Sequence, residues 1–461
     1  MIQSIDQMPA VTSPEDWAKA KCDKYDYLIA AFCGGVAGLV DVFFVGDPLS
    51  SKLGKGVDKV ADKFVQKAAQ FFWKHDQRAS GKPKKMPQSL VQCISYLEQA
   101  FPVNYDARYA KDLKVKGDTL SGMRPANHHL LSFSHSPDII GLIFSIIDQF
   151  TDLATFVDGG KIICVKPEKT SGAIPYLQGT NLPSRLFCGF VNWLGHLISD
   201  LAGSSSTRDP KKDSRGSGIP IPFYELFLFC DFGNIDGKTL AETMISVFEQ
   251  GYDARFGVTM AIPVILQDLM IRVIWLIRQK IFRKKSWKES LPSDKHADLR
   301  IMLIVGNAMF CVIDGADAAV RGFSAGNVVT FICHLNLPGW ARLVTLVLKE
   351  LSIRYGPVVI EKLNRFGEAV LGIMTPAEKK KLRLFYARLE EYDRQLNDLY
   401  VQFIAQIEDE YRELYQEIDE TFSGDNNSSE QAAHSVRVAE LSGVDDSKII
   451  RDLDQLDDLF S

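Results

Sequence analysis

Long apolar segments constrain the fold of this chain more than any other feature of its sequence. They lie at 27–46, 138–157, 256–277 and 326–348. An α-helix needs about 20 apolar residues to cross the hydrocarbon core of a bilayer. The helical spacing of apolar residues therefore predicts a mainly α-helical protein, an apolar multi-helix bundle that is either embedded in a membrane or buried in one large soluble core.

The first apolar segment illustrates why the sequence leaves both environments open. Gly34 and Gly38 would allow close packing of this segment against another helix. Asp41 interrupts the same segment, and an acid inside a membrane is costly unless it is paired or hydrated. The segment is therefore either a membrane helix with a buried or functional Asp41, or a core helix of a soluble bundle.

Basic residues follow two of the apolar segments. Residues 52–85 are rich in lysine, with apolar side chains at helical spacing, so this helix is either a solvated surface helix or lies on anionic lipid headgroups. A second basic cluster at 278–285 follows the apolar segment that contains Pro263, which predicts a kink. Such a cluster is typical of a cytoplasmic membrane boundary, and also of a helix C-terminus.

The C-terminal quarter of the chain has a different, strongly charged character. Apolar residues from Leu382 to Phe403 recur at intervals of three and four, which is the spacing of a heptad seam. We expect one long amphipathic helix over 377–422 that pairs with another helix, either in the same chain or in a second copy. The segment that follows, rich in serine and asparagine, predicts a flexible linker.

The chain is too long for a single ordinary core, because it has 461 residues. Composition changes place the predicted boundaries as follows: an N-terminal apolar segment with lysine-rich amphipathic helices (1–127), an apolar helical core (128–375), the long heptad-like helix (376–422) and a flexible acidic tail (423–461).

Charge, cysteines and the N-terminus limit the compartment and the partners. A net charge of −5 gives no reason to expect nucleic-acid binding. The eight cysteines are scattered without a CxxC pair, which favours free thiols in a reducing compartment over a zinc–thiolate site. The first 25 residues are polar and acidic, so we expect no cleavable signal peptide and a protein of the cytoplasm or the inner (cytoplasmic) membrane that is not secreted.

Four of the eight histidines fall in two short segments and form the one chemical constellation of the sequence. His128, His129 and His135 lie in NHHLLSFSHSPD, and His196 and Asp200 lie four residues apart in GHLISD. If 128–136 is helical, His128 and His135 share a face, whereas adjacent histidines point about 100° apart. Two apolar helices would then offer nitrogen and oxygen ligands to each other, as bundles do at metal sites.

A histidine and aspartate set without thiolate suits a divalent metal such as zinc or manganese. Asp138 follows His135 closely and could be a further ligand or a partner of an imidazole. The alternative is that these histidines are hydrogen-bonded core residues and bind no metal.

The order of these motifs resembles that of the membrane-bound metal-dependent hydrolases of bacterial inner membranes, a family distantly similar to zinc-dependent phospholipase C. HHLLSFSHS, GHLISDLAG and GIPIPF correspond to the H…THS, gHxxxD and G…PF elements of that family, over about 128–224. His128 or His129 would match its first histidine, His135 the HS pair, and His196 with Asp200 the later pair. The arginine that often follows the first histidine is absent.

This resemblance implies metal-assisted hydrolysis of a phosphoester or lipid substrate at a membrane. Asp138 or Asp200 would be the general base, and a basic loop would meet the anionic substrate through Arg208, Lys211, Lys212 and Arg215. Two other functions remain open on the sequence alone. One is a non-enzymatic helical membrane or scaffold protein that recruits a partner through 377–422, and the other is a membrane-perturbing effector.

Overall fold

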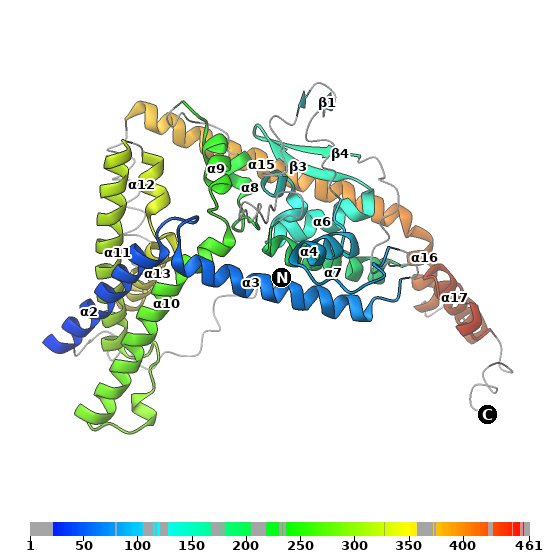
Figure 1. The fold of residues 1–461 in the computed structure, drawn as a ribbon. Coiled ribbons are helices and arrows are strands. Elements are labelled where there is room, and N and C mark those ends of the chain that lie inside the picture. Colours follow the sequence, from blue (N-terminus) through cyan, green and yellow to red (C-terminus); the bar gives the residue numbers. More distant parts are fainter. Residues whose placement is uncertain are drawn as a thin grey trace. The chain divides into compact units, whose positions relative to one another are not determined.

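The fold is mainly α-helical, as the apolar periodicity predicts (Figure 1). The structure is a computed structural model, and it describes residues 22–78, 81–104, 114–115, 118–119, 128–166, 177, 179, 181–203, 218–229, 233, 237–326, 328–356, 372, 375–422, 427–444, 446–451 and 455.

The chain divides into two compact units, which are described separately below. Unit 1 comprises Met1–Val60, Gly233–Thr239 and Ser246–Arg383, and unit 2 comprises Ala61–Phe232, Leu240–Ile245 and Leu384–Ser461.

Unit 1 is a bundle of apolar helices. Its principal elements are α2 (Lys24–Val40) with the π-helical extension η2 (Asp41–Val45), α10 (Ala254–Ile277) with η5 (Arg278–Phe282), α11 (Ala297–Ala325), α12 (Val328–His334) and α13 (Leu337–Tyr355). Helix α2 packs against α10 and α11. Gly34 and Gly306 meet so closely that a Cβ on Gly34 would lie 2.1 Å from the Gly306 carbonyl oxygen, so only glycine fits there.

Among the described residues, three helices are long and apolar enough to cross a membrane: Lys24–Val45, Ala254–Phe282 and Ala297–Ala325. Two of the four predicted apolar segments are not single long helices. Helix α6 (Ile139–Thr151) stops inside 138–157, because Asp152 adopts a left-handed conformation and a strand follows. The segment 326–348 is divided between α12 and α13, where Asn336 caps α13 through the Gly339 amide.

The basic cluster after α10 is paired within the chain. Arg278 donates to Asp26 and to Asp23, and Arg283 donates to Asp26 and to Asp298. The acids come from the start of α2 and the start of α11, so these ion pairs join one end of the three long helices. Helix α10 itself continues through Pro263.

Unit 2 is built mostly from helices that are shorter than those of unit 1. It contains the C-terminal part of α3 (Lys52–His75), α4 (Leu90–Ala100), α5 (His128–Leu131), the 3-10 turn η4 (Phe133–His135), α6, α7 (Leu182–Leu201), α8 (Glu225–Phe229) and the first part of α9 (Leu240–Glu249). A core of buried residues from α3, α4 and α7 includes Val65, Ile94, Leu97 and Ala202.

The strand predicted at 161–166 is present as β4 (Lys161–Val165). It pairs antiparallel with β3 (Ala154–Asp158), with Ala154 opposite Val165. A second, very short antiparallel pair joins β1 (Lys114–Val115) and β2 (Asp118–Thr119). Strand β3 was not predicted, since it follows α6 without any break in the apolar composition.

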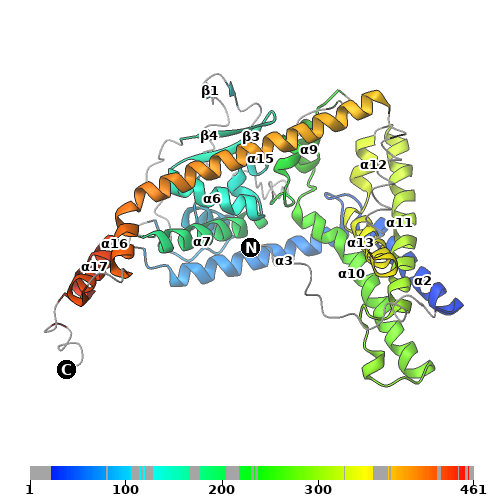
Figure 2. The ribbon, with the colours of Figure 1, turned by 180° about the vertical axis from the view of Figure 1, so that it is seen from behind.

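The long C-terminal helix is divided into α15 (Pro376–Glu410) and α16 (Arg412–Phe422). Its seam packs on unit 2 of the same chain: Phe403 joins a buried cluster with Ile147 and Phe150 of α6, and Figure 2 shows α15 crossing that region. The predicted flexible tail at 423–461 includes the helix α17 (Ser428–Leu441), because Asn427 caps it and α16 packs against it.

Candidate metal centre

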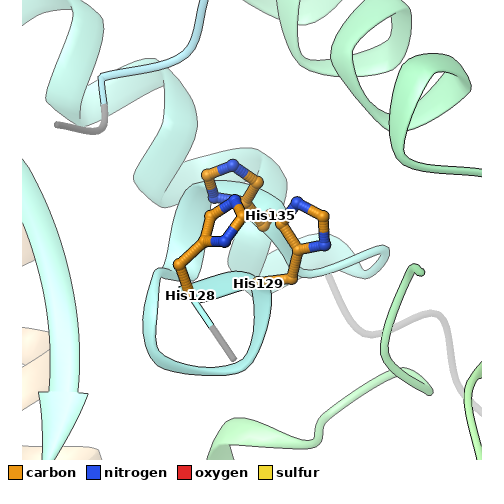
Figure 3. A group of neighbouring side chains, drawn as sticks. All are labelled: His128, His129 and His135. Atoms are coloured by element: carbon orange, nitrogen blue, oxygen red, sulfur yellow. The ribbon is translucent and has the colours of Figure 1, made fainter. Parts of the chain in front are cut away.

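Two short elements and one long helix of unit 2 bring the predicted histidines together. His128 and His129 lie on α5, a single turn of helix, after which Ser132 adopts an extended conformation and bridges to Phe156 of β3. His135 follows on η4 and faces back toward α5, and Figure 3 shows the three rings gathered around one point. The segment 128–136 is therefore a turn rather than one helix, and the turn places both adjacent histidines beside His135.

Helix α7 adds His196 and Asp200, one turn apart. Within the described chain, two groups of side chains could hold a metal ion: His128, His129 and His135, and His135, His196 and Asp200. In each group the ligand atoms lie within 4.8 Å of one another, and all the side chains are buried. The two groups share His135, so every histidine and the carboxylate predicted as ligands are brought to one place.

The separations between ligand atoms fit a metal coordination shell. His135 Nε2 lies 3.2 Å from His196 Nε2, and Asp200 Oδ1 lies 3.4 Å from His129 Nε2 and 3.8 Å from His196 Nε2. Zinc binds imidazole nitrogen at about 2.0–2.1 Å in a tetrahedron, which sets ligand atoms about 3.3–3.5 Å apart. The residues present therefore fit a divalent ion in both donor type and spacing.

Backbone carbonyls fix the orientation of two of these imidazoles. The Nδ1 atom of His129 lies 3.0 Å from the Gly218 carbonyl oxygen, and Nδ1 of His196 lies 2.9 Å from the Phe101 carbonyl oxygen. Because a carbonyl oxygen only accepts hydrogen bonds, each Nδ1 must carry the proton. In the neutral rings each Nε2 then bears a lone pair, which is the tautomer that metal-binding histidines adopt.

Asp200 receives little help from hydrogen-bond donors in this pocket. Its Oδ1 accepts from Ser199 Oγ at 3.4 Å, but that hydroxyl has a nearer acceptor, the His196 carbonyl oxygen, at 2.6 Å. Its buried Oδ2 has no hydrogen-bond partner among the described residues. Burial raises the pKa of Asp200, and a single proton there could serve one of the two facing Nε2 atoms but not both.

Burial also keeps His129 and His135 uncharged. Desolvation lowers the pKa of His129 to about 3, although its bond to the Gly218 carbonyl opposes the shift. Desolvation and the neighbouring histidines hold the pKa of His135 well below its usual value. These two imidazoles are thus neutral at physiological pH, which is the form that binds metal.

Asp138 lies outside these ligand groups and caps α6. Its Oδ1 accepts from the amides of Ile140 and Gly141, and its Oδ2 accepts from Ser136 Oγ at 2.5 Å and the Phe223 amide at 2.8 Å. Both oxygens are engaged, so Asp138 holds the turn at Phe223 in place, and its role as a general base stays a prediction.

Glu225 is an acidic residue near the site that the sequence did not single out. Its Oε2 lies 3.1 Å from Ser136 Oγ, although the single hydrogen of that hydroxyl has a nearer acceptor in Asp138 Oδ2, and Ser136 directly follows His135. The buried Oε1 has no hydrogen bond to any described residue, and burial together with the charge of Asp138 raises the pKa of Glu225 to about 7. A carboxylate inside the apolar run IPIPFYELFLF was the available signal.

The predicted basic residues Arg208, Lys211, Lys212 and Arg215 lie outside the described residues. Compared with protein-family models, curated proteins and solved structures, the chain matches none. The resemblance of 128–224 to the membrane-bound hydrolases therefore stays a prediction, and the function is inferred from the geometry of the pocket.

Proposed function

We propose that this chain is a membrane-associated, metal-dependent hydrolase that acts on a phosphoester or lipid substrate. One observation carries the metal site. The Nε2 lone pairs of His129 and His196, fixed by backbone carbonyls, converge on Asp200 Oδ1 in a buried pocket. Few protons are available to these acceptors: His135 Nε2, 3.2 Å from His196 Nε2, can donate to that ring only, and a cation at the centre would instead ligate all of them.

Zinc or manganese fits the donor set best. His129, His135, His196 and Asp200 would hold the ion, with His128 beside them, and a shell of nitrogen and oxygen donors without thiolate suits either metal. When bound, such an ion lowers the pKa of a coordinated water and polarises a phosphoryl or carbonyl oxygen.

The carboxylates of the pocket would accept and hold the proton that water releases. The unpartnered Oδ2 of Asp200 can accept a proton from water at the pocket, provided that its Oδ1 is the ligand atom. Glu225, linked to the pocket through Ser136, can hold a proton near neutral pH because its pKa is about 7. Asp138 would hold Ser136 and the Phe223 turn in place.

The three long apolar helices support membrane association. Their outward faces carry exposed apolar residues, among them Phe32 on α2, Ile265 on α10 and Val312 on α11. Large apolar side chains exposed along several helices fit a lipid environment better than water. With the resemblance to inner-membrane hydrolases, this favours the cytoplasmic membrane as the location.

Metal analysis of protein purified in detergent tests the proposal. We expect stoichiometric zinc or manganese, its removal by chelator with a lower melting temperature, and chelator-sensitive hydrolysis of a phosphodiester or of phospholipid vesicles. Replacement of the exposed His75 by alanine is the matched control and should leave the metal content unchanged. Protein without metal after growth in supplemented medium, and with a melting temperature indifferent to chelator, would overturn the metal site. Bound metal without hydrolysis would favour a non-enzymatic membrane protein.

A further inference from the structure

Helix α3 presents two parallel ridges to its exposed side. Val60, Phe64 and Phe71 are 69%, 51% and 58% exposed and recur at intervals of four and seven, so they form one apolar ridge. Four exposed lysines flank this ridge on one side: Lys59, Lys63, Lys67 and Lys74. An exposed apolar ridge beside a cationic ridge is typical of a helix that lies in the interface of a bilayer.

The opposite face of α3 already has its core. Val65 and Ala69 are fully buried and pack with Cys93 and Leu97 of α4. Because the small residues of α3 face this core, the helix cannot rotate to bury Phe64 without exposing Val65. Phe64 and Phe71 therefore stay more than half exposed, and the ring contacts of Phe71 are to Phe72 and His75 of α3 itself.

The charge of the exposed face is one-sided. The acids of α3, which the structure describes along its whole length, are Asp58 and Asp62, and both are half-buried on the side away from the ridges. The exposed face thus offers ammonium groups without competing carboxylates from its own helix. This charge is complementary to the phosphates of anionic lipids, to which each lysine near the surface adds affinity.

The position of α3 in the chain brings it to a membrane surface. It begins after a connection of six residues that follows Val45, the end of a helix able to cross a bilayer. Such a connection reaches at most about 20 Å, so the start of α3 stays close to the bilayer surface when that helix spans it. Leu49 in this connection is 86% exposed, so it adds an exposed apolar side chain between the two helices.

We propose that the exposed face of α3 lies on the headgroups of an anionic bilayer, with Phe64 and Phe71 inserted between lipids and the lysines at the phosphates. This inference rests on the membrane association proposed above and is independent of the metal centre. A helix that lies flat on the surface would hold unit 2 beside lipid, which is where a lipid substrate is found.

Tryptophan quenching by brominated lipids tests the position of this face. The full chain carrying Phe64→Trp is reconstituted into vesicles of brominated phosphatidylcholine, alone or with an equal part of equally brominated phosphatidylglycerol, and its fluorescence is compared with that of the parent. We expect the added tryptophan to be quenched more strongly with phosphatidylglycerol, and less so in high salt. Phe422→Trp, at an exposed position of α16, is the control and should not respond.

Replacing lysines should distinguish binding to anionic headgroups from insertion of the apolar side chains alone. Lys63→Gln with Lys67→Gln should weaken the lipid-bound state of α3 about 25-fold, at about fivefold for each lysine, and abolish the difference between the two lipids. Lys380→Gln with Lys381→Gln on α15 should not. Protein that enters vesicles but shows equal quenching at Phe64→Trp and Phe422→Trp would overturn the inference. So would quenching at Phe64→Trp that decreases as the protein concentration rises, because this indicates that a second copy covers the face. Protein that never enters vesicles would instead refute membrane association.

Discussion

Each unit buries a carboxylate site among apolar helices, and the two sites obtain their hydrogen bonds in different ways. In unit 1, Asp314 accepts from the Asn336 amide at 3.0 Å and from Trp340 Nε1 at 2.7 Å, while Asp41 accepts from Asn336 Nδ2 at 2.5 Å. In unit 2, Asp200 faces two imidazole lone pairs. Asp314 and Asp41 find good donors within the chain, whereas Asp200 has only the Ser199 hydroxyl at 3.4 Å, and the proposed cation rests on this contrast.

The contrast is tested most strongly by removing one member of the unit 2 site. His196→Ala should lose more than about a hundredfold in metal affinity, since even partners outside the coordination shell are worth 10–100-fold. Elemental analysis of parent and variant, set beside their melting temperatures, measures this. A variant that loses stability while the parent never held metal would make His196 an ordinary core histidine.

The reciprocal change in unit 1 should act on stability alone. Asn336→Ala removes the donor to Asp41 and the cap of α13, which should lower the free energy of unfolding by about 1–3 kcal/mol. Metal content should stay at the parental level. Leu337→Ala, at an exposed neighbour, serves as the control for thermal or denaturant unfolding, and metal loss in Asn336→Ala would remove the distinction between the two sites.

Acid should weaken unit 2 through its buried histidines. The pKa of His129 is about 3 in the folded chain and near 6.5 in the unfolded chain, so only the unfolded chain takes up the proton as the pH falls below 6.5. The contribution of neutral His129 is complete above that pH and declines on the order of 2 kcal/mol by about pH 5. Denaturant midpoints of metal-free protein should fall at least this steeply, because the pKa of His135 is lowered as well, and His129→Gln should reduce the slope while His75→Gln does not.

The smallest expected effect concerns the chemistry of the carboxylate. Asp200→Asn keeps an oxygen that can coordinate but removes the charge, so it should weaken metal binding by about tenfold, less than Asp200→Ala. Competition with a chromophoric chelator measures both affinities. Equal losses in the two variants would mean that Asp200 contributes charge alone.

The sequence predicted the apolar helices well because their periodicity is local. The ends of these helices were harder. Asp152, where α6 ends, and Asn336, between α12 and α13, are ordinary polar residues whose turn conformations depend on packing. The same holds for α17, whose predicted flexibility came from its serine- and asparagine-rich start, although Asn427 is there a helix cap.

The ligand set of the candidate site could be predicted from residue types, but its supporting groups could not. His135 reaches the site through a turn, not through the helical face that its spacing predicted. The carbonyls of Phe101 and Gly218 leave no trace in the sequence, because any residue can supply a carbonyl. The different duties of Asp138 and Glu225 likewise depend on which backbone amides surround them.

The contacts of His129 with the Gly218 carbonyl and of His196 with the Phe101 carbonyl also determine when the site can form during synthesis. They join His129 to a residue 89 positions later and His196 to one 95 positions earlier. The orienting partners of both rings are therefore present only after the ribosome has released the chain beyond Gly218. Metal capture, as proposed, would then be a late step that follows synthesis of nearly half of the chain.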